Sequence, residues 1–290
     1  MRGAASPATS GRMIVDTSAA ANWRYAKGLG RAFAGAIIFS LPILMTMEMW
    51  QLGFYLERTK LLQFALVNFV VLVGLSRLSG FEKTDSWWQD LTDALSAYGI
   101  ATLASLAVLA MFAIIDPSMP STEVIGKVAI QSVPASFGAM LGAKQLGSRD
   151  ERGKDEERDR STYVGQLFLM MAGALFLGFS VAPTEEMILI SFRMTAWQSV
   201  LLVVASILLL HGFVYAVGFK GQEEPPGPTG FFSLFFRFSI VGYAIASIVG
   251  FYLLWTFGRI EETSVAQAAS MVAVLAFPGS VGAAIARLII

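Results

Sequence analysis

The sequence predicts an all-α, polytopic membrane protein with eight transmembrane helices. Hydrophobic residues make up 55% of the 290 residues, charged residues only 14%, and the mean hydropathy is +0.63. Soluble domains carry about 25% charged residues, so this composition is typical of a membrane protein. Apolar runs of about 20 residues, the length that a bilayer core requires, recur along the chain. Charged or proline-containing stretches separate the runs.

The predicted elements follow in chain order. Residues 1–30 are polar and basic, which indicates an N-terminal cytoplasmic tail with an irregular start. The first apolar run lacks the cleavage site of a signal peptide and is expected to be a retained span. The eight predicted spans are residues 32–55, 61–79, 94–115, 123–146, 165–192, 197–219, 231–257 and 266–287.

Two stretches outside the spans carry their own signals. Segment 80–93 has two tryptophans and four acids, so we expect an interfacial helix that leads into the third span. Residues 147–162 alternate in charge sign, which is typical of a solvated linker, here a charged cytoplasmic one.

Sequence motifs recur at nearly constant spacing. Thr46-Met-Glu48-Met matches Thr184-Glu-Glu186-Met at 138 positions, and Pro134-Ala-Ser136 matches Pro278-Gly-Ser280 at 144. The spacing changes where the second half has a proline-rich insertion, as a duplicated gene predicts. The repeats would cover residues 31–146 and 163–290. Small residues that converge independently on helix-packing faces are the alternative explanation.

The number of helices in each unit fixes the symmetry of the predicted repeat. A unit with four helices returns the chain to the side from which it entered. Both copies therefore enter the membrane from the same side, as parallel 4+4 repeats related by a pseudo-two-fold axis along the membrane normal.

The distribution of lysine and arginine predicts the orientation. With the N-terminus inside, the cytoplasmic segments hold fifteen basic residues and the outer loops hold four. This asymmetry places both termini in the cytoplasm.

Several classes of function are excluded or disfavoured by composition. The chain has no cysteine and one histidine, which excludes disulfides, thiolate metal sites and multi-histidine sites. The net charge is zero, so no basic footprint for nucleic acid is present. The familiar catalytic and nucleotide-binding motifs are absent, and we expect neither an enzyme nor an organic cofactor.

The repeated acids are the candidate site. Glu48 and Glu186 would face each other across the symmetry axis as cation ligands or direct metal ligands, assisted by Glu185, Thr46 and Thr184. Carboxylate and hydroxyl oxygens suit Na⁺ or Ca²⁺. Two close carboxylates could instead share a proton, H⁺. The alternative is that each acid caps a helix or pairs with Lys127 or Arg193.

Two further sets of residues are candidates. Prolines near the centres of spans four and eight are expected to break these helices, and the small polar residues after them would line a pathway or hinge. This set is Pro134, Ser136, Gly138, Pro278, Ser280 and Gly282. The alternative is that these small residues only let the helices pack closely. An inner ion pair between Asp93 and Arg237 is the second candidate, with snorkelling of Arg237 to the interface as its alternative.

Four runs of sequence resemble a family of bacterial polytopic integral membrane proteins of unknown function. They are residues 40–50 (SLPILMTMEMW), 182–187 (APTEEM), 134–138 (PASFG) and 254–261 (LWTFGRIE). The resemblance covers the chain beyond residue 25 and implies a multi-pass protein of the bacterial inner (cytoplasmic) membrane. It implies no activity.

The leading hypothesis is a cation channel or secondary transporter, with the lipid bilayer and an inorganic cation as partners and a homo-oligomer as a compatible assembly. A membrane scaffold or sensor without transport is the competing hypothesis. An intramembrane enzyme comes third and would need a further polar group, such as Asn68 or Gln131, in a water-filled cavity.

Overall fold

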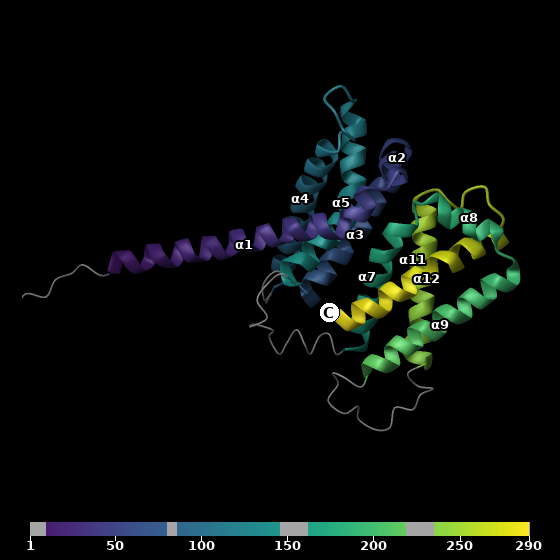
Figure 1. Ribbon diagram of the computed structural model, residues 1–290. Coiled ribbons are helices and arrows are strands. Elements are labelled where there is room, and N and C mark those ends of the chain that lie inside the picture. The colour runs from purple at the N-terminus through teal and green to yellow at the C-terminus, as the bar shows by residue number, and fades with distance from the viewer. Residues whose placement is uncertain (1–9, 80–85, 146–161, 219–234, 290) are drawn as a thin grey trace, which may run out of the picture.

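The computed structural model describes residues 10–79, 86–145, 162–218 and 235–289, and in these ranges all regular structure is helical (Figure 1). The helices of the first half are α1 (Ser10–Leu44), α2 (Met47–Tyr55), α3 (Arg58–Ser79), α4 (Trp87–Met111) and α5 (Ser121–Gln145). Those of the second half are α7 (Tyr163–Val181), α8 (Glu185–Arg193), α9 (Ala196–Gly218), the π-helix η2 (Phe235–Ile240), α11 (Val241–Thr256) and α12 (Val265–Ile289).

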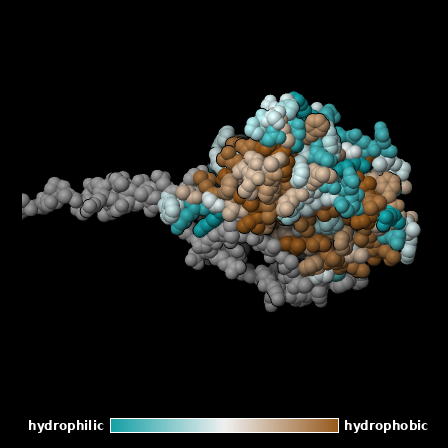
Figure 2. All heavy atoms as spheres, turned by 45° about the horizontal axis from the view of Figure 1, so that its top comes forward, coloured by the Kyte–Doolittle hydropathy of each residue, from teal (hydrophilic) through white to brown (hydrophobic). Residues whose placement is uncertain are grey.

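Eight helical segments within the described residues are long and apolar enough to cross a membrane, which confirms the predicted number of spans. Their outward faces are apolar: Val70 and Ile248 are each 69% exposed. Figure 2 shows hydrophobic residues over broad areas of the face in view. A bundle with apolar side chains on its outer surface is suited to lipid. Soluble monomeric proteins expose only small apolar patches to water.

One helix forms the centre of each half. α5 packs against α1, α2, α3 and α4, and α12 packs against α7, α8, α9 and α11. Small residues allow this close packing, because backbones approach each other where side chains are short. On α5, Gly138 and Gly142 lie against Gly35 of α1, and on α12, Gly282 lies against Gly173 of α7.

A cluster of phenylalanine rings joins the two halves. Phe64 of α3 lies 5.5 Å from Phe179 of α7 and 5.3 Å from Phe257, which follows α11. Phe137 of α5 lies 5.5 Å from Phe179 and 6.4 Å from Phe176, all measured between ring centroids. Edge-on ring contacts of this kind add to the burial energy of the aromatic side chains. The junction between the halves is therefore apolar at this level.

Two predicted spans are each divided in the structure. The sequence predicts single helices over 32–55 and 165–192, but the first ends at Leu44 before α2 and the second ends at Val181 before α8. The proline after α7, Pro183, has no N–H to continue the helical bonding. In both breaks a threonine amide bonds to the carbonyl three residues earlier, which tightens the chain and ends the helix. Hydropathy does not detect such an end.

The central prolines do not unwind their helices, contrary to the prediction. α5 is continuous through Pro134 and α12 through Pro278. Neighbouring helices surround both residues and hold the helical path, as tertiary packing in membrane proteins allows. The helical path is interrupted instead at the ends of α1 and α7.

Three predictions concern the connecting segments. The N-terminal tail is helical from Ser10, since α1 begins there, and Figure 1 shows its first turns running outward from the bundle. Trp87 to Asp93 are not a separate interfacial helix, because α4 begins at Trp87 with Ser86 as its cap. The linker 147–162 lies almost wholly outside the described residues.

Candidate functional site

The first acidic helix break comprises residues 45–48. The Thr46 amide donates to the Ile43 carbonyl at 3.0 Å, and the Thr46 hydroxyl donates to the Pro42 carbonyl at 2.9 Å. The indole N–H of Trp50 donates to the Leu44 carbonyl at 2.6 Å. The chain thus satisfies the carbonyls at the end of α1 from its own neighbouring residues. The Thr46 hydroxyl oxygen keeps its lone pairs for another donor or a cation.

Glu48 lies in the first turn of α2 and is partly buried. The positive end of a helix dipole stabilises a carboxylate in this position. Among the described residues no basic side chain lies within ion-pair distance of Glu48. Lys127, one of its two expected partners, instead binds Glu123 at 2.7 Å.

The second acidic helix break comprises residues 182–186. The amide and hydroxyl of Thr184 donate to the Val181 carbonyl at 3.1 and 2.8 Å. The guanidinium of Arg259 donates to the Pro183 carbonyl. Glu185 and Glu186 lie exposed in the first turn of α8, and within the described chain neither has a basic partner, Arg193 included.

The two breaks occupy different halves at one end of the bundle. Because the eight candidate spans alternate in direction, the segments 45–57, 112–120, 182–195 and 257–264 share an end, which we call the acidic end. α2 packs on α5 and α8 packs on α12 (Figure 1). The cross-axis pairing of Glu48 with Glu186 stays a prediction. The described residues contain no group of three or more acidic or histidine side chains that could hold a metal ion.

The predicted pathway residues lie within the packed bundle, and their role in a pathway or hinge stays a prediction. Ser136 accepts a hydrogen bond from Asn68 at 3.0 Å and donates to the Val133 carbonyl at 2.6 Å. Gly138 and Gly282 are the close approaches to α1 and α7 described above. Ser280 is fully buried, and its hydroxyl has no hydrogen-bond partner within the described residues. Pro134 is buried and Pro278 is partly buried.

The two members of the predicted inner pair have other contacts. Asp93 accepts a hydrogen bond from the Ser76 hydroxyl at 3.2 Å. The Arg237 guanidinium lies 5.0 Å from the ring centre of Tyr163, whose hydroxyl donates to the Arg237 carbonyl at 2.9 Å. Arg237 is exposed, as a side chain that reaches the membrane interface would be.

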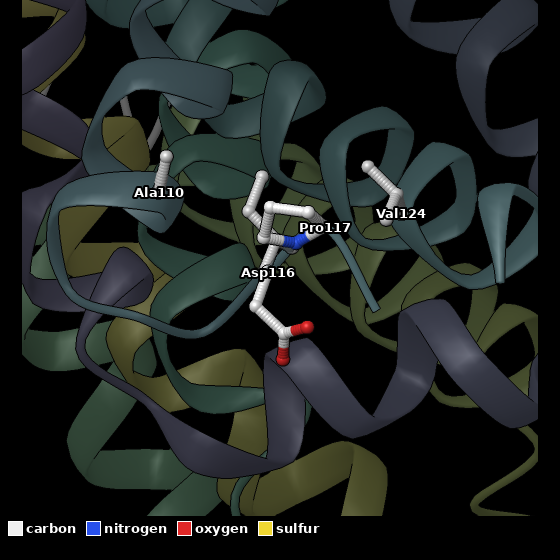
Figure 3. Close-up of a pocket in the computed structure, with 5 residues that line it drawn as sticks. Ala110, Asp116, Pro117 and Val124 are labelled. Atoms are coloured by element: carbon white, nitrogen blue, oxygen red, sulfur yellow. The ribbon is translucent and has the colours of Figure 1, made fainter. Parts of the chain in front are cut away.

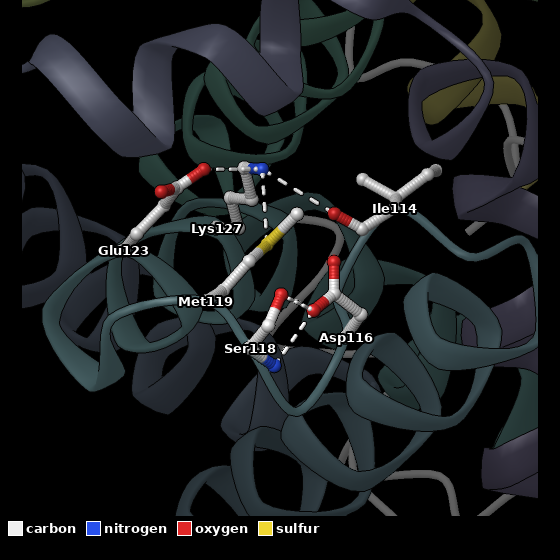
Figure 4. A network of polar contacts seen from close by, with 6 residues as sticks. All are labelled: Ile114, Asp116, Ser118, Met119, Glu123 and Lys127. Carbon is white, nitrogen blue, oxygen red and sulfur yellow. Dashed lines mark hydrogen bonds and ion pairs between the residues drawn. The ribbon is translucent and has the colours of Figure 1, made fainter.

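A polar network at the acidic end escaped the sequence reasoning. The Lys127 ammonium binds Glu123, donates to the Ile114 carbonyl at 3.3 Å and lies 3.7 Å from the Met119 sulfur (Figure 4). A carboxylate in the first turn of an apolar helix, with a lysine four residues later on the same face, is the signal that could have found it. The network ties the loop 112–120 to α5.

Asp116 occupies the same loop outside the spans. The Ser118 hydroxyl and amide both donate to its carboxylate, the amide at 2.7 Å, and they lower the pKa of Asp116 below its ordinary value. Beside it, Ala110, Ile115, Pro117 and Val124 contribute to a small pocket. Figure 3 shows the Asp116 carboxylate pointing away from Ala110 and Val124, so the pocket wall there is apolar.

Comparison with known proteins bears on the class of the chain. A family model described as "Putative integral membrane protein (DUF2391)" matches residues 28–290. The chain belongs to this family. The match begins within α1 and includes every helix after it, so the resemblance drawn from the sequence motifs is confirmed. The protein is an integral, multi-pass membrane protein that contacts the lipid bilayer. No curated protein and no solved structure matches the chain.

Proposed function

We propose that this family member is a duplicated 4+4 membrane protein. The helix bounds support the duplication. Met47 and Glu185, which begin α2 and α8, are 138 positions apart, as are Tyr55 and Arg193, which end them. α3 and α9 also begin 138 positions apart, at 58 and 196. α5 and α12 begin and end 144 positions apart, at 121 and 265 and at 145 and 289.

Backbone detail supports the same proposal. After α4, the amide of residue 112 donates to the carbonyl of 108 at 2.9 Å, that of 113 to 110 at 3.0 Å, and that of 114 to 109 at 2.9 Å. After α11, the amide of 257 donates to the carbonyl of 253 at 2.9 Å, that of 258 to 255 at 3.1 Å, and that of 259 to 254 at 2.8 Å. Each of these bonds lies 145 positions after its equivalent at the end of α4. The two helix ends thus have the same hydrogen-bond pattern at positions that the duplication would relate, which supports it.

We infer that the duplicated bundle moves a cation, as a channel or secondary transporter. The observation that carries this inference is an acid in the first turn after a helix break, in both halves, with no basic partner among the residues that the structure describes. Discontinuous membrane helices with polar groups at their breaks are how many transporters build ion sites. The breaks directly follow the last residues of two candidate spans, Leu44 and Val181, so their acids lie at the end of the bundle, where carboxylates attract cations.

Charge at the acidic end supports a cation rather than an anion. Its segments, residues 45–57, 112–120, 182–195 and 257–264, include seven acids and two bases. A surface with this excess concentrates cations at its entrance. Oxygen ligands and the absence of cysteine favour Na⁺, Ca²⁺ or H⁺ as the moving species. The proposal includes no catalytic reaction.

The proposed setting is the bacterial inner membrane, with both termini in the cytoplasm and the acidic end outside. The excess of lysine and arginine on the opposite side supports this orientation. Eight spans, an even number, would return the C-terminus to the side of the N-terminus, which is consistent with this orientation.

A scaffold or sensor without transport is the second candidate. The phenylalanine cluster favours it, because rings from α1, α3, α5 and α7 fill the junction where a central pore would lie. Transport therefore needs a route other than this junction.

Flux into proteoliposomes tests the transport proposal. Uptake of ²²Na⁺ and ⁴⁵Ca²⁺, and a pH-sensitive dye for H⁺, would be compared for the wild type, Glu48→Gln and Glu186→Gln. Loss of a charged ligand should raise the half-saturating cation concentration by about tenfold, the equivalent of roughly 1.4 kcal/mol. Glu57→Gln, at the same end but outside the breaks, is the matched control. Wild-type flux in both break variants would refute the site, and no flux of any cation by the wild type would favour the scaffold.

A further inference from the structure

Gln131 of α5 is a buried amide without a partner. Its exposed fraction is 0%, and neither its amide oxygen nor its amide nitrogen has a hydrogen-bond partner within the described residues. Burying an amide without hydrogen bonds costs about 1–3 kcal/mol in proteins. The amide needs a molecule that both donates to its oxygen and accepts from its nitrogen. Water meets both needs, whereas a bare cation meets only the first.

Two serines lie at the same depth of the bundle. Ser105 of α4 is fully buried, and its hydroxyl is also without a partner in the described part of the chain. Ser40 of α1 is fully buried and donates to the Ala36 carbonyl, so its oxygen can still accept a hydrogen bond.

An apolar cluster fixes this level. Leu44 of α1, Val108 of α4 and Val128 of α5 pack together near the acidic end. On the side of this cluster away from the acidic end, Ser40 lies four residues from Leu44 in the sequence. Likewise, Ser105 lies three residues from Val108, and Gln131 lies three residues from Val128. Residues three and four apart on a helix share a face. The three polar side chains therefore lie one helical turn inward, where α1, α4 and α5 meet.

The second half is apolar at the corresponding junction. By the spacings of the proposed duplication, Ser40, Ser105 and Gln131 correspond to Gly178, Gly250 and Leu275. A Cβ on Gly250 would lie 3.6 Å from the Leu275 side chain, and one on Gly178 would lie 2.6 Å from Leu253. Glycine and leucine thus pack well in the second half, at positions where the first half has three polar groups.

We propose that Gln131, Ser105 and Ser40 form a hydrated binding site inside the first four-helix unit. Pro134 removes the N–H that would bond to the Ile130 carbonyl, so a backbone oxygen beside Gln131 also lacks its helical donor. Together these neutral oxygens can hold water and replace part of the hydration shell of a monovalent cation. The cation then crosses within the first unit and not through the phenylalanine junction. This last step rests on the proposed transport function, whereas the hydrated site does not.

The chain offers a direct test, because it has no cysteine. Gln131→Cys and its counterpart Leu275→Cys would each be reacted, in nanodiscs, with 2-aminoethyl methanethiosulfonate, a small water-borne thiol reagent. We expect Gln131→Cys to react at least about tenfold faster, the effect of roughly 1.4 kcal/mol in the barrier. Equal rates, or a faster reaction at Leu275→Cys, would overturn the hydrated site. If Gln131→Cys does not fold, Ser105→Cys against Gly250→Cys gives the same comparison.

Flux measurement separates this inference from the proposed function. Gln131→Leu introduces the residue of the second half, and we expect it to reduce cation flux by about tenfold or more while the protein stays folded. Fast labelling with no wild-type flux would leave the hydrated site standing and refute transport. Wild-type flux that Gln131→Leu does not change would refute the route through the first unit.

Discussion

Gly35 of α1 and Gly138 of α5 are in direct backbone contact. A Cβ on Gly35 would lie 2.4 Å from the Gly138 carbonyl oxygen, and one on Gly138 would lie 2.6 Å from the Gly35 carbonyl oxygen. The same contact recurs between Gly173 and Gly282, where either Cβ would lie 2.2 Å from the opposite carbonyl oxygen. Each half is thus closed by a glycine pair that tolerates no side chain.

Substitution of these glycines should separate the helices. We expect Gly35→Ala and Gly173→Ala each to destabilise the protein by about 1–3 kcal/mol, as overpacking does in a rigid core. Thermal unfolding in detergent, followed by circular dichroism, measures the change. Gly99→Ala is the control: nothing lies within 4 Å of its Cβ position, and alanine should improve the helix by up to about 1 kcal/mol. Equal effects at all three sites would contradict this account.

The two helix ends after α4 and α11 should respond to substitution in opposite directions. Ala113 has φ +54° and its counterpart Gly258 has φ +69°, a conformation that costs alanine roughly 1–2 kcal/mol. Part of this is offset by the entropy of glycine in the unfolded chain. Ala113→Gly should therefore stabilise the protein by about 0.5–1 kcal/mol, and Gly258→Ala should destabilise it by a similar amount. Melting temperatures that move in the same direction would refute the prediction.

The Lys127–Glu123 pair should be coupled. Only 10% of the lysine side chain and 20% of the glutamate side chain are exposed. Glu123→Gln leaves the ammonium without its carboxylate and should cost about 2–3 kcal/mol, less than for a fully enclosed pair. The corresponding residues of the second half are Met271 and Gln267. The double variant Lys127→Met/Glu123→Gln should recover most of the loss, and a double-mutant cycle of unfolding free energies measures the coupling. Additive effects would show that the two residues act independently.

Asp116 should stabilise its loop in a pH-dependent way. The pKa of the folded carboxyl group is lowered, first by the Ser118 hydroxyl and then by the Ser118 amide. Its contribution is therefore complete above the unfolded pKa of about 3.9 and is lost as the pH falls through the lower folded pKa. Selective ¹⁵N-serine labelling would follow the Ser118 amide shift across this range. Ser118→Ala should raise the titration midpoint, read from ¹³C-labelled aspartate, and an unchanged midpoint would contradict the assignment.

The acids of the candidate site could be predicted from the sequence, because an acid in an apolar run is unusual by itself. Glu48 and Glu186 stand out in the sequence because each is an acid within a long apolar run. Their placement after helix breaks was not foreseen, because a break depends on the Thr46 and Thr184 bonds and not on hydropathy. Lys127 was offered as a partner of Glu48, yet a closer acid on the same helix binds it.

The sequence alone determined that this protein is helical, that it has eight candidate membrane spans and that similar motifs place an acid at Glu48 and at Glu186. These properties follow from the free energy of transferring side chains from water to lipid, which depends only on the residues of each segment. Only the tertiary structure decided that phenylalanines such as Phe64 and Phe179 fill the junction between the halves. It also decided that Gln131 is buried with no hydrogen-bond partner in the part of the chain that the structure describes. Both depend on which segments, distant along the chain, pack side by side, and packing is a property of pairs of surfaces that no single stretch encodes.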